Sequence, residues 1–212
     1  LNCSFFRLLF LIMTTIPSVF FLTLAETSLS RIDKLSLSDE TLLDLLVSAI
    51  TNNDRLIMNP NAPIDCKNLR KVTLSDTNEI IGINWGLSSL KGSLLLEWLP
   101  NTLQKGNFRS NYLRGTILLT DLPESLVELD LRSNLFEGTL DSTQLPRNLE
   151  KLLLGMNNFE GETDFSKLPD TLIDLDVSSN SSLSGDIRNA LSVKRRILTI
   201  DTEAKSRRSF KA

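Results

Sequence analysis

Four asparagines recur at intervals of 23 residues: Asn111, Asn134, Asn157 and Asn180. A row of side-chain amides could hold a polar ligand, or it could hydrogen-bond backbone groups that a sharp bend leaves unpaired. Each asparagine follows a short stretch with apolar residues at regular positions, and the first three lie two residues before another apolar residue. We therefore expect the four amides to be structural and to form a ladder from one bend to the next.

Side chains that perform catalysis are scarce. The 212 residues include no histidine, which removes the usual general base and most zinc chemistry. Cys66 has no histidine to activate it, and the sequence contains neither a glycine-rich phosphate loop nor a Gly-x-Ser-x-Gly motif. The carboxylates are scattered and are not paired as an acid and a base. The sequence therefore predicts no enzyme, no cofactor and no metal site.

The asparagines belong to a repeat that begins at residues 80, 103, 126, 149 and 172. In the third unit, Leu129 and Leu131 flank one polar residue, so both point to the same face of a short strand. One unit cannot bury its leucines alone, whereas units stacked about 4.8 Å apart form a parallel sheet over a continuous core. Gly138 and its equivalents tolerate a positive φ, and a Leu-Pro pair precedes four of the units.

A few positions depart from this pattern. Ser88 stands where an asparagine is expected, and Gly106 and Thr163 replace apolar residues. One inserted residue shifts the end of the fifth unit, from Leu183 onward. Leu198 lies where a sixth strand would fall.

The pattern resembles that of the leucine-rich repeat proteins, whose consensus is LxxLxLxxNxLxGxI. Its glycine ending and its period resemble those of the plant-type extracellular class and of similar proteins of some protists. The resemblance covers about residues 78–187. It implies an α/β (β-rich) solenoid with short parallel strands on its concave face, and it implies that this face binds proteins or peptides.

The concave face is here the solvent side of the strands, formed by the residues between and beside the strand leucines. Arg132, Leu153 and Met156 are expected to contribute most, since central apolar residues and arginines are frequent hot spots. The candidate partner-binding residues are Lys105, Asn107, Arg109, Glu128, Asp130, Arg132, Lys151, Leu153, Met156, Asp174, Asp176 and Ser178.

The sequence divides into four regions. Residues 1–25 predict a signal peptide, with Arg7 before an apolar run that ends at Ala25; a retained membrane anchor is the alternative. Residues 26–77 predict an N-terminal helical cap region. Residues 78–190 hold about five repeats, and 191–212 a degraded C-terminal repeat and a basic tail.

The cap helix is expected within residues 35–53. Ser38 is a candidate N-cap, and acidic residues follow it in the first turn. Its apolar face is expected at Leu42, Leu45, Leu46 and Ala49.

A net charge of -3 and a pI near 5.1 give no reason to expect nucleic acid as a partner. With the signal removed, Cys66 has no internal partner, which leaves a buried thiol or an intermolecular disulfide. The sequence thus predicts a secreted or cell-surface recognition module, with membrane contact only through a retained N-terminal segment or a missing region. The alternatives are a fragment of the ectodomain of a receptor, such as a receptor kinase, and an inhibitor of an extracellular hydrolase.

Overall fold

The computed structural model describes residues 34–59, 61, 68–186, 197–199 and 210–211. The predicted signal peptide, Cys66 and most of the basic tail lie outside the described residues. The chain divides into two units, Leu1–Leu37 and Ser38–Ala212. The described part of the first unit contains a 3-10 helix, Lys34–Ser36. The repeats belong to the second unit.

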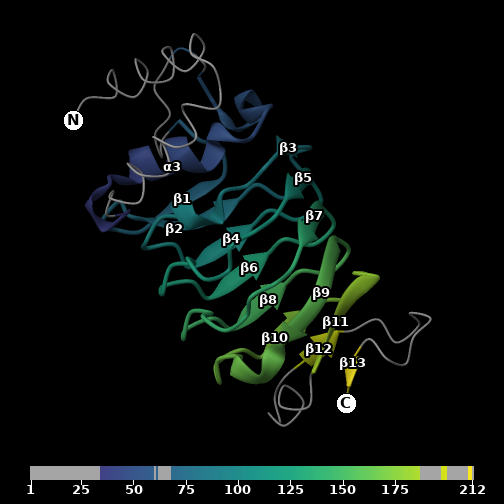
Figure 1. Ribbon diagram of the computed structural model, residues 1–212. Coiled ribbons are helices and arrows are strands. Elements are labelled where there is room, and N and C mark those ends of the chain that lie inside the picture. Colours follow the sequence, from purple (N-terminus) through teal and green to yellow (C-terminus); the bar gives the residue numbers. More distant parts are fainter. Residues whose placement is uncertain (1–33, 60, 62–67, 187–196, 200–209, 212) are drawn as a thin grey trace, which may run out of the picture. The chain divides into compact units, whose positions relative to one another are not determined.

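One strand of each repeat enters a seven-stranded sheet (Figure 1). In spatial order its strands are β1 (Val72–Leu74), β2 (Ile80–Asn84), β4 (Lys105–Asn107), β6 (Glu128–Asp130), β8 (Lys151–Leu153), β10 (Asp174–Asp176) and β12 (Ile197–Thr199). From β2 onward the strands are parallel, and each residue pairs with the residue 23 positions later, as Leu129 does with Leu152. The register confirms the period read from the sequence, including a sixth strand in which Leu198 pairs with Leu175.

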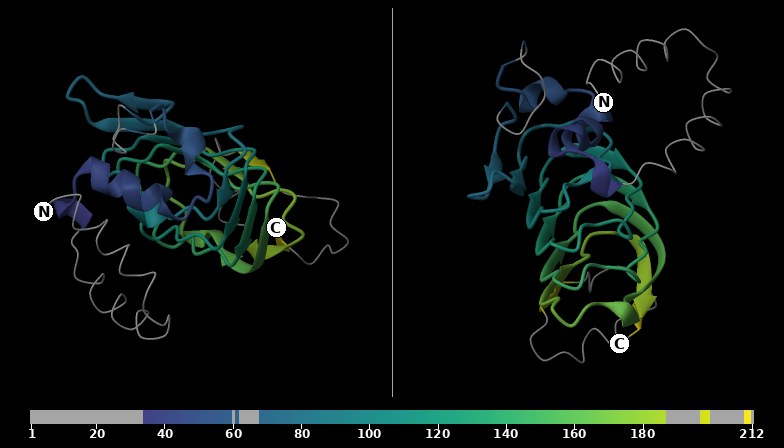
Figure 2. Two further views of the ribbon diagram at one scale, coloured as in Figure 1. Left: turned by 90° about the horizontal axis from the view of Figure 1, so that it is seen from above. Right: turned by 90° about the vertical axis from the view of Figure 1, so that its left-hand side faces the viewer.

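A second sheet lies on the other side of each turn (Figures 1 and 2). Its strands are β13 (Phe210–Lys211), β11 (Ser182–Asp186), β9 (Asn158–Asp164), β7 (Leu135–Gly138), β5 (Tyr112–Gly115) and β3 (Lys91–Gly92). In the first four repeats the repeated glycine lies in this sheet with a positive φ, which is 84° at Gly138. A Cβ at Gly138 would lie 2.8 Å from the Thr116 Cγ2 of the preceding turn, so a larger residue would push the turns apart.

The strand leucines and the aromatic residues of the repeat fill the space between the two sheets. Leu129, Leu131 and Leu126 are fully buried. The rings of Phe136 and Phe159, from consecutive turns, stack with their centroids 6.4 Å apart. The core is therefore continuous along the stack, as the repeat predicts.

The asparagines form the predicted ladder. The Nδ2 of Asn134 donates to the carbonyl of Leu131 in its own turn and to that of Phe108 in the preceding turn, each at 3.0 Å. Its Oδ1 accepts the N–H of Leu113, also in the preceding turn, at 3.2 Å. Asn111, Asn157 and Asn180 repeat the arrangement, so all four are buried and structural.

In each bend, the residue before the ladder asparagine, or before Ser88 in the first bend, lies in the left-handed region. The φ values there lie between 54° and 58°. Backbone of this kind favours glycine, asparagine and other small polar residues. The residues at this position are Leu87, Ser110, Ser133, Met156 and Ser179.

Helix α3 (Asp39–Ser48) is the described helix of the predicted cap region. Ser38 is its N-cap, as expected, and accepts a hydrogen bond from the Thr41 N–H at 3.3 Å. The predicted helix was too long and its apolar face partly wrong: Leu45 is half-buried, and Ala49 is the C-cap. The side chains that α3 buries are Leu42, Leu43, Leu46 and Val47.

The helix ends early because the following backbone pairs with the second sheet. The Ser93 N–H donates to the Ala49 carbonyl and the Thr51 N–H to the Lys91 carbonyl, each at 2.9 Å. These bonds cover the free edge of β3, as β1 covers the edge of β2 by antiparallel pairing. The remaining 3-10 helices are Asn53–Leu56, Leu96–Trp98 and Phe165–Lys167.

Replacing Leu152 by Ala should lower the free energy of unfolding by about 2–5 kcal/mol, because it empties a fully enclosed position in the core. Leu135→Ala is the matched control, since that leucine is exposed and should cost less than about 1 kcal/mol. Urea denaturation measures both. Equal losses would contradict the inward placement of the strand leucines.

Replacing Asn157 by Ala should cost about 1–3 kcal/mol, since it removes the acceptor of the buried Phe136 N–H. The Leu131 and Leu154 carbonyls each lose one of two amide donors and keep the other, from Asn134 and Asn180. The neighbouring Asn158 is exposed, and Asn158→Ala should change stability little. A small loss in the first variant, measured in the same denaturation experiment, would show that the ladder is dispensable.

Candidate functional site

The strand residues of the concave face form two rows that cross the sheet. The register places Lys105, Glu128, Lys151 and Asp174 side by side in the outer row. The second row contains Asn107, Asp130, Leu153 and Asp176. We call it the cap row, because three of its side chains hydrogen-bond the turn after their strand. These eight predicted site residues are thus brought together, because strand residues on either side of an inward leucine share the opposite face.

Charges alternate along the outer row. The Lys151 Nζ lies 3.8 Å from Glu128 Oε2, and both side chains are about one-third exposed or more, so the pair adds at most about 1 kcal/mol. Lys105, at the start of the row, is exposed and forms no ion pair with a described residue. The outer row therefore offers charged ends that a partner can contact.

The cap row serves the backbone first. Asn107 Oδ1 accepts the Arg109 N–H at 3.1 Å, and Asp130 Oδ1 accepts the Arg132 N–H at 3.0 Å. Asp176 does the same for Ser178 at 3.0 Å. These side chains close the turns that follow β4, β6 and β10, which is a common role of asparagine and aspartate.

Three of the predicted partner-binding residues lie differently from the expectation. Leu153 is 5% exposed and Asp130 is 6% exposed, so neither offers much surface to a partner. Met156 is 58% exposed but lies at the left-handed bend after β8, beside the Ser133 hydroxyl, and not beside the strand leucines. The fourth unit has Gly155 where the third has Arg132, and Met156 corresponds to Ser133, so the prediction placed this methionine one position too far along the repeat.

Arg132 lies between two carboxylates. Its Nε and Nη2 donate to Asp130 at 3.0 and 2.6 Å, and its Nη1 is 3.9 Å from Asp176 Oδ2, two turns away. Gly155 makes room in the turn between, since a Cβ there would lie 2.7 Å from Asp176 Oδ1. The hydrogen bond to Asp130 raises the pKa of Arg132 above its ordinary value, so the guanidinium stays charged.

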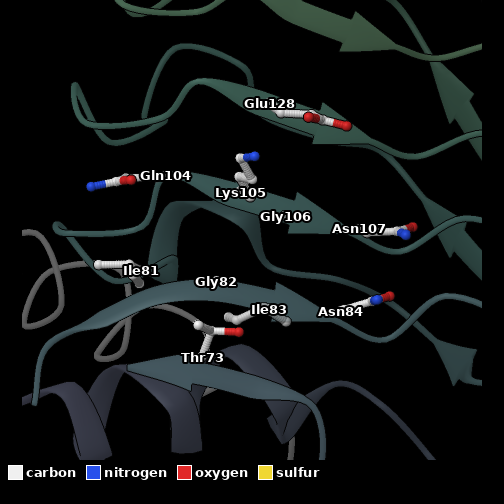
Figure 3. A pocket seen from close by; sticks show the side chains of 10 residues that line it. All are labelled: Thr73, Ile81, Gly82, Ile83, Asn84, Gln104, Lys105, Gly106, Asn107 and Glu128. Carbon is white, nitrogen blue, oxygen red and sulfur yellow. The ribbon is translucent and has the colours of Figure 1, made fainter. Parts of the chain in front are cut away.

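An open hollow of about 580 Å³ occupies the N-terminal end of the concave face (Figure 3). Its floor is exposed because Gly82 stands in the outer row where later turns carry a lysine or an acid. In Figure 3, Asn84 and Asn107 project in the same direction from the ends of β2 and β4. Gln104 and Lys105 also line the hollow, and Thr73 on β1 lies beside Gly82.

Sequence reasoning missed this hollow. Thr73, Asn84 and Gln104 were not among the candidates, because β1 was not predicted and the first repeat was not used to define the concave face. The available signal was Gly82, which breaks the charged outer row in that repeat.

The described residues contain no group of three or more His, Cys, Asp or Glu side chains that could hold a metal ion. In the same part of the chain, no helix combines the length and apolar character needed to cross a bilayer.

No protein-family model matches the chain, and no curated protein matches it by sequence. Solved structures are similar in fold. The crystal structure of PEPR1–AtPEP1 has a TM-score of 0.59 at 21% identity, with 77% of this chain covered. The BIR3–SERK2 complex from Arabidopsis thaliana has a TM-score of 0.55 at 22% identity over 77% of this chain.

A third similar structure is the LRR ectodomain of the plant membrane receptor kinase GASSHO1/SCHENGEN3 from Arabidopsis thaliana in complex with CASPARIAN STRIP INTEGRITY FACTOR 2. Its TM-score is 0.54 at 21% identity over 77% of this chain. The chain spans 24% of the PEPR1 structure and 21% of the GASSHO1/SCHENGEN3 structure, but 94% of the matched chain in the BIR3–SERK2 complex.

Replacing Asp130 by Ala should lower the free energy of unfolding by about 1–3 kcal/mol, because the Arg132 N–H loses its acceptor beside a buried side chain. Asp130→Asn should cost less, since Asn107 makes the same bond at the equivalent position of the preceding turn. Thermal unfolding of both variants is the measurement. If Asp130→Asn lost as much stability as Asp130→Ala, the main role of Asp130 would be its ion pair with Arg132 and not its hydrogen bond to the backbone.

Proposed function

We propose that this chain, a leucine-rich repeat protein, recognises a protein or peptide ligand through its concave face and performs no catalysis. The observation that carries the proposal is the pair of rows across β4, β6, β8 and β10. The cap row and the core hold the backbone in place, while the outer row presents charged side-chain ends to solvent. A rigid surface with exposed charges loses little conformational freedom on binding, which favours recognition of a partner.

The charges on this face predict the chemistry of the ligand. Over β6 to β10 the carboxylates of Glu128, Asp130, Asp174 and Asp176 outnumber the cations of Arg132 and Lys151. Toward β2 the hollow presents side-chain amides and the free cation of Lys105. A ligand with basic groups over the later turns and an acidic or amide-rich end over the hollow would complement the face.

The similar structures support a binding role. Two of them, by their titles, hold an ectodomain or receptor together with a second component, PEPR1 with AtPEP1 and GASSHO1/SCHENGEN3 with CASPARIAN STRIP INTEGRITY FACTOR 2. The absence of histidine from the sequence also favours binding over acid–base catalysis, and we propose no cofactor.

A secreted or cell-surface location fits the predicted signal peptide. Because the chain spans only about a quarter of the PEPR1 structure, a fragment of a receptor ectodomain, such as that of a receptor kinase, is the second candidate. Inhibition of an extracellular hydrolase through the same face is the third.

The test begins with random linear peptides displayed on phage and selected against the folded protein. The dissociation constants of the selected peptides are then measured for the wild type and for Lys105→Glu/Asp174→Lys, two outer-row residues that cap no backbone group. We expect a loss of about tenfold or more for most peptides, since both ends of the charged row are reversed.

The matched control is Arg114→Glu/Glu137→Lys, which makes the same charge exchange on exposed residues of the second sheet. It should leave the affinities unchanged within about twofold. Equal losses in both variants, or none in either, would contradict recognition by the concave face.

A further inference from the structure

A second exposed surface lies at the bends that lead from the first sheet to the second, near the N-terminal end of the repeats. It consists of two adjoining hollows that share Leu87. The lateral surface, as we name it, is lined by Arg55, Arg70, Lys71, Leu87, Ser88, Ser89, Ser110, Tyr112 and Ser133.

Leu87 is the least expected residue of this surface. It is 82% exposed and adopts a φ of 56°. The same left-handed position is serine in three of the other four bends, as suits backbone that small polar residues tolerate better. A leucine there gains no burial and fits its backbone poorly. Departures of this kind from the local rule are typical of functional positions.

Three cations surround the hollow of about 360 Å³ on one side of Leu87. The Arg70 Nε and the Lys71 Nζ each lie 3.4 Å from a backbone carbonyl, of Ile57 and Gly86, and not beside a carboxylate. Neither they nor Arg55 form an ion pair with any residue that the structure describes. No acidic side chain is among the described residues that line this hollow. The hollow therefore attracts an anion.

The hollow of about 380 Å³ on the other side of Leu87 is neutral. Ser89, Ser110, Ser133 and the half-exposed Tyr112 line it, and the Ser133 hydroxyl also donates to the Met156 sulfur at 3.2 Å. It extends over three consecutive bends, and turns stacked about 4.8 Å apart give it the length of three or four residues of an extended chain. Hydroxyls can bond the backbone of such a chain, while Leu87 and Tyr112 contact its apolar side chains.

We propose that the lateral surface binds an acidic, leucine-containing segment of a partner polypeptide, with its carboxylates at Arg55, Arg70 and Lys71 and its apolar side chains along Leu87 and Tyr112. The charge of the first hollow and the neutral, partly apolar lining of the second select this occupant. An anionic membrane would need a broader cationic area than three residues, and a polysaccharide would be expected to use more than one aromatic ring. This surface is separate from the concave face and does not depend on it.

The probe is the peptide acetyl-Asp-Glu-Asp-Gly-Leu-Ser-Leu-amide, titrated without a label into ¹⁵N-labelled full-chain protein and followed by NMR. We expect saturable shifts of the Leu87, Ser110 and Tyr112 amides, weakened as salt is raised. The charge-reversed peptide, acetyl-Lys-Arg-Lys-Gly-Leu-Ser-Leu-amide, should give none. No saturable shift with the acidic peptide at about 1 mM would overturn the proposal.

Leu87→Ser is the deciding variant, because it restores the residue of the neighbouring bends and should fold at least as well as the wild type. It should weaken the acidic peptide about tenfold, as should Arg70→Gln/Lys71→Gln. Leu118→Ser is the control: it removes another exposed leucine that lines neither hollow, and it should leave the affinity unchanged within about twofold.

Equal affinity of the wild type and the Leu87→Ser variant would overturn the proposal. So would phosphatidylserine vesicles or oligogalacturonate that shift the same amides equally in both proteins, because charge alone would then explain binding. The outer-row exchange Lys105→Glu/Asp174→Lys should not change the affinity for the acidic peptide. A negative result for the lateral surface is therefore distinguishable from a negative result for recognition by the concave face.

Discussion

Every bend of the solenoid depends on hydrogen bonds that it shares with the bend before it. The side chain of Asn157 joins carbonyls of its own turn and of the preceding one, and it also accepts an N–H from the preceding turn. A bend of this kind leaves backbone groups unpaired inside the protein, and leaving them so would cost several kcal/mol in each turn. The asparagine side chains pair these backbone groups only when the turns are stacked in register. It therefore ties the bends, the two sheets and the period to one another.

This demand also restricts which residues remain for recognition. The ladder asparagines are used by the backbone, and so are Asn107, Asp130 and Asp176 in the row beside the core. The outer-row side chains make no such hydrogen bonds to the described backbone, so the charges of Lys105 and its neighbours can change without loss of the fold. A repeat protein can thus keep its fold while its exposed row changes, because stability and recognition depend on different positions of the same strand.

Departures from the repeat mark the places where the surface becomes distinctive. Gly82 removes one side chain from the outer row and opens the hollow over β2 and β4. Gly155, at the position of the next turn that corresponds to Arg132, has no side chain and lets Arg132 reach Asp176 across that turn. Leu87 puts an apolar side chain on backbone that suits serine, next to cations that form no ion pair with a described residue. The repeat explains the fold, and these exceptions distinguish this solenoid from others.

The sequence alone determined the period, the parallel register, the inward leucines, the glycines with positive φ and the ladder, because each follows from local spacing that stacking merely repeats. It also located the outer row and the N-cap Ser38. Only the tertiary structure decided that Leu153 is buried, that β1 covers the first edge and that two hollows meet at Leu87. These depend on contacts between side chains from different turns, whose outcome is set by the size and charge of residues far apart in the sequence. Spacing within one repeat carries no information about them.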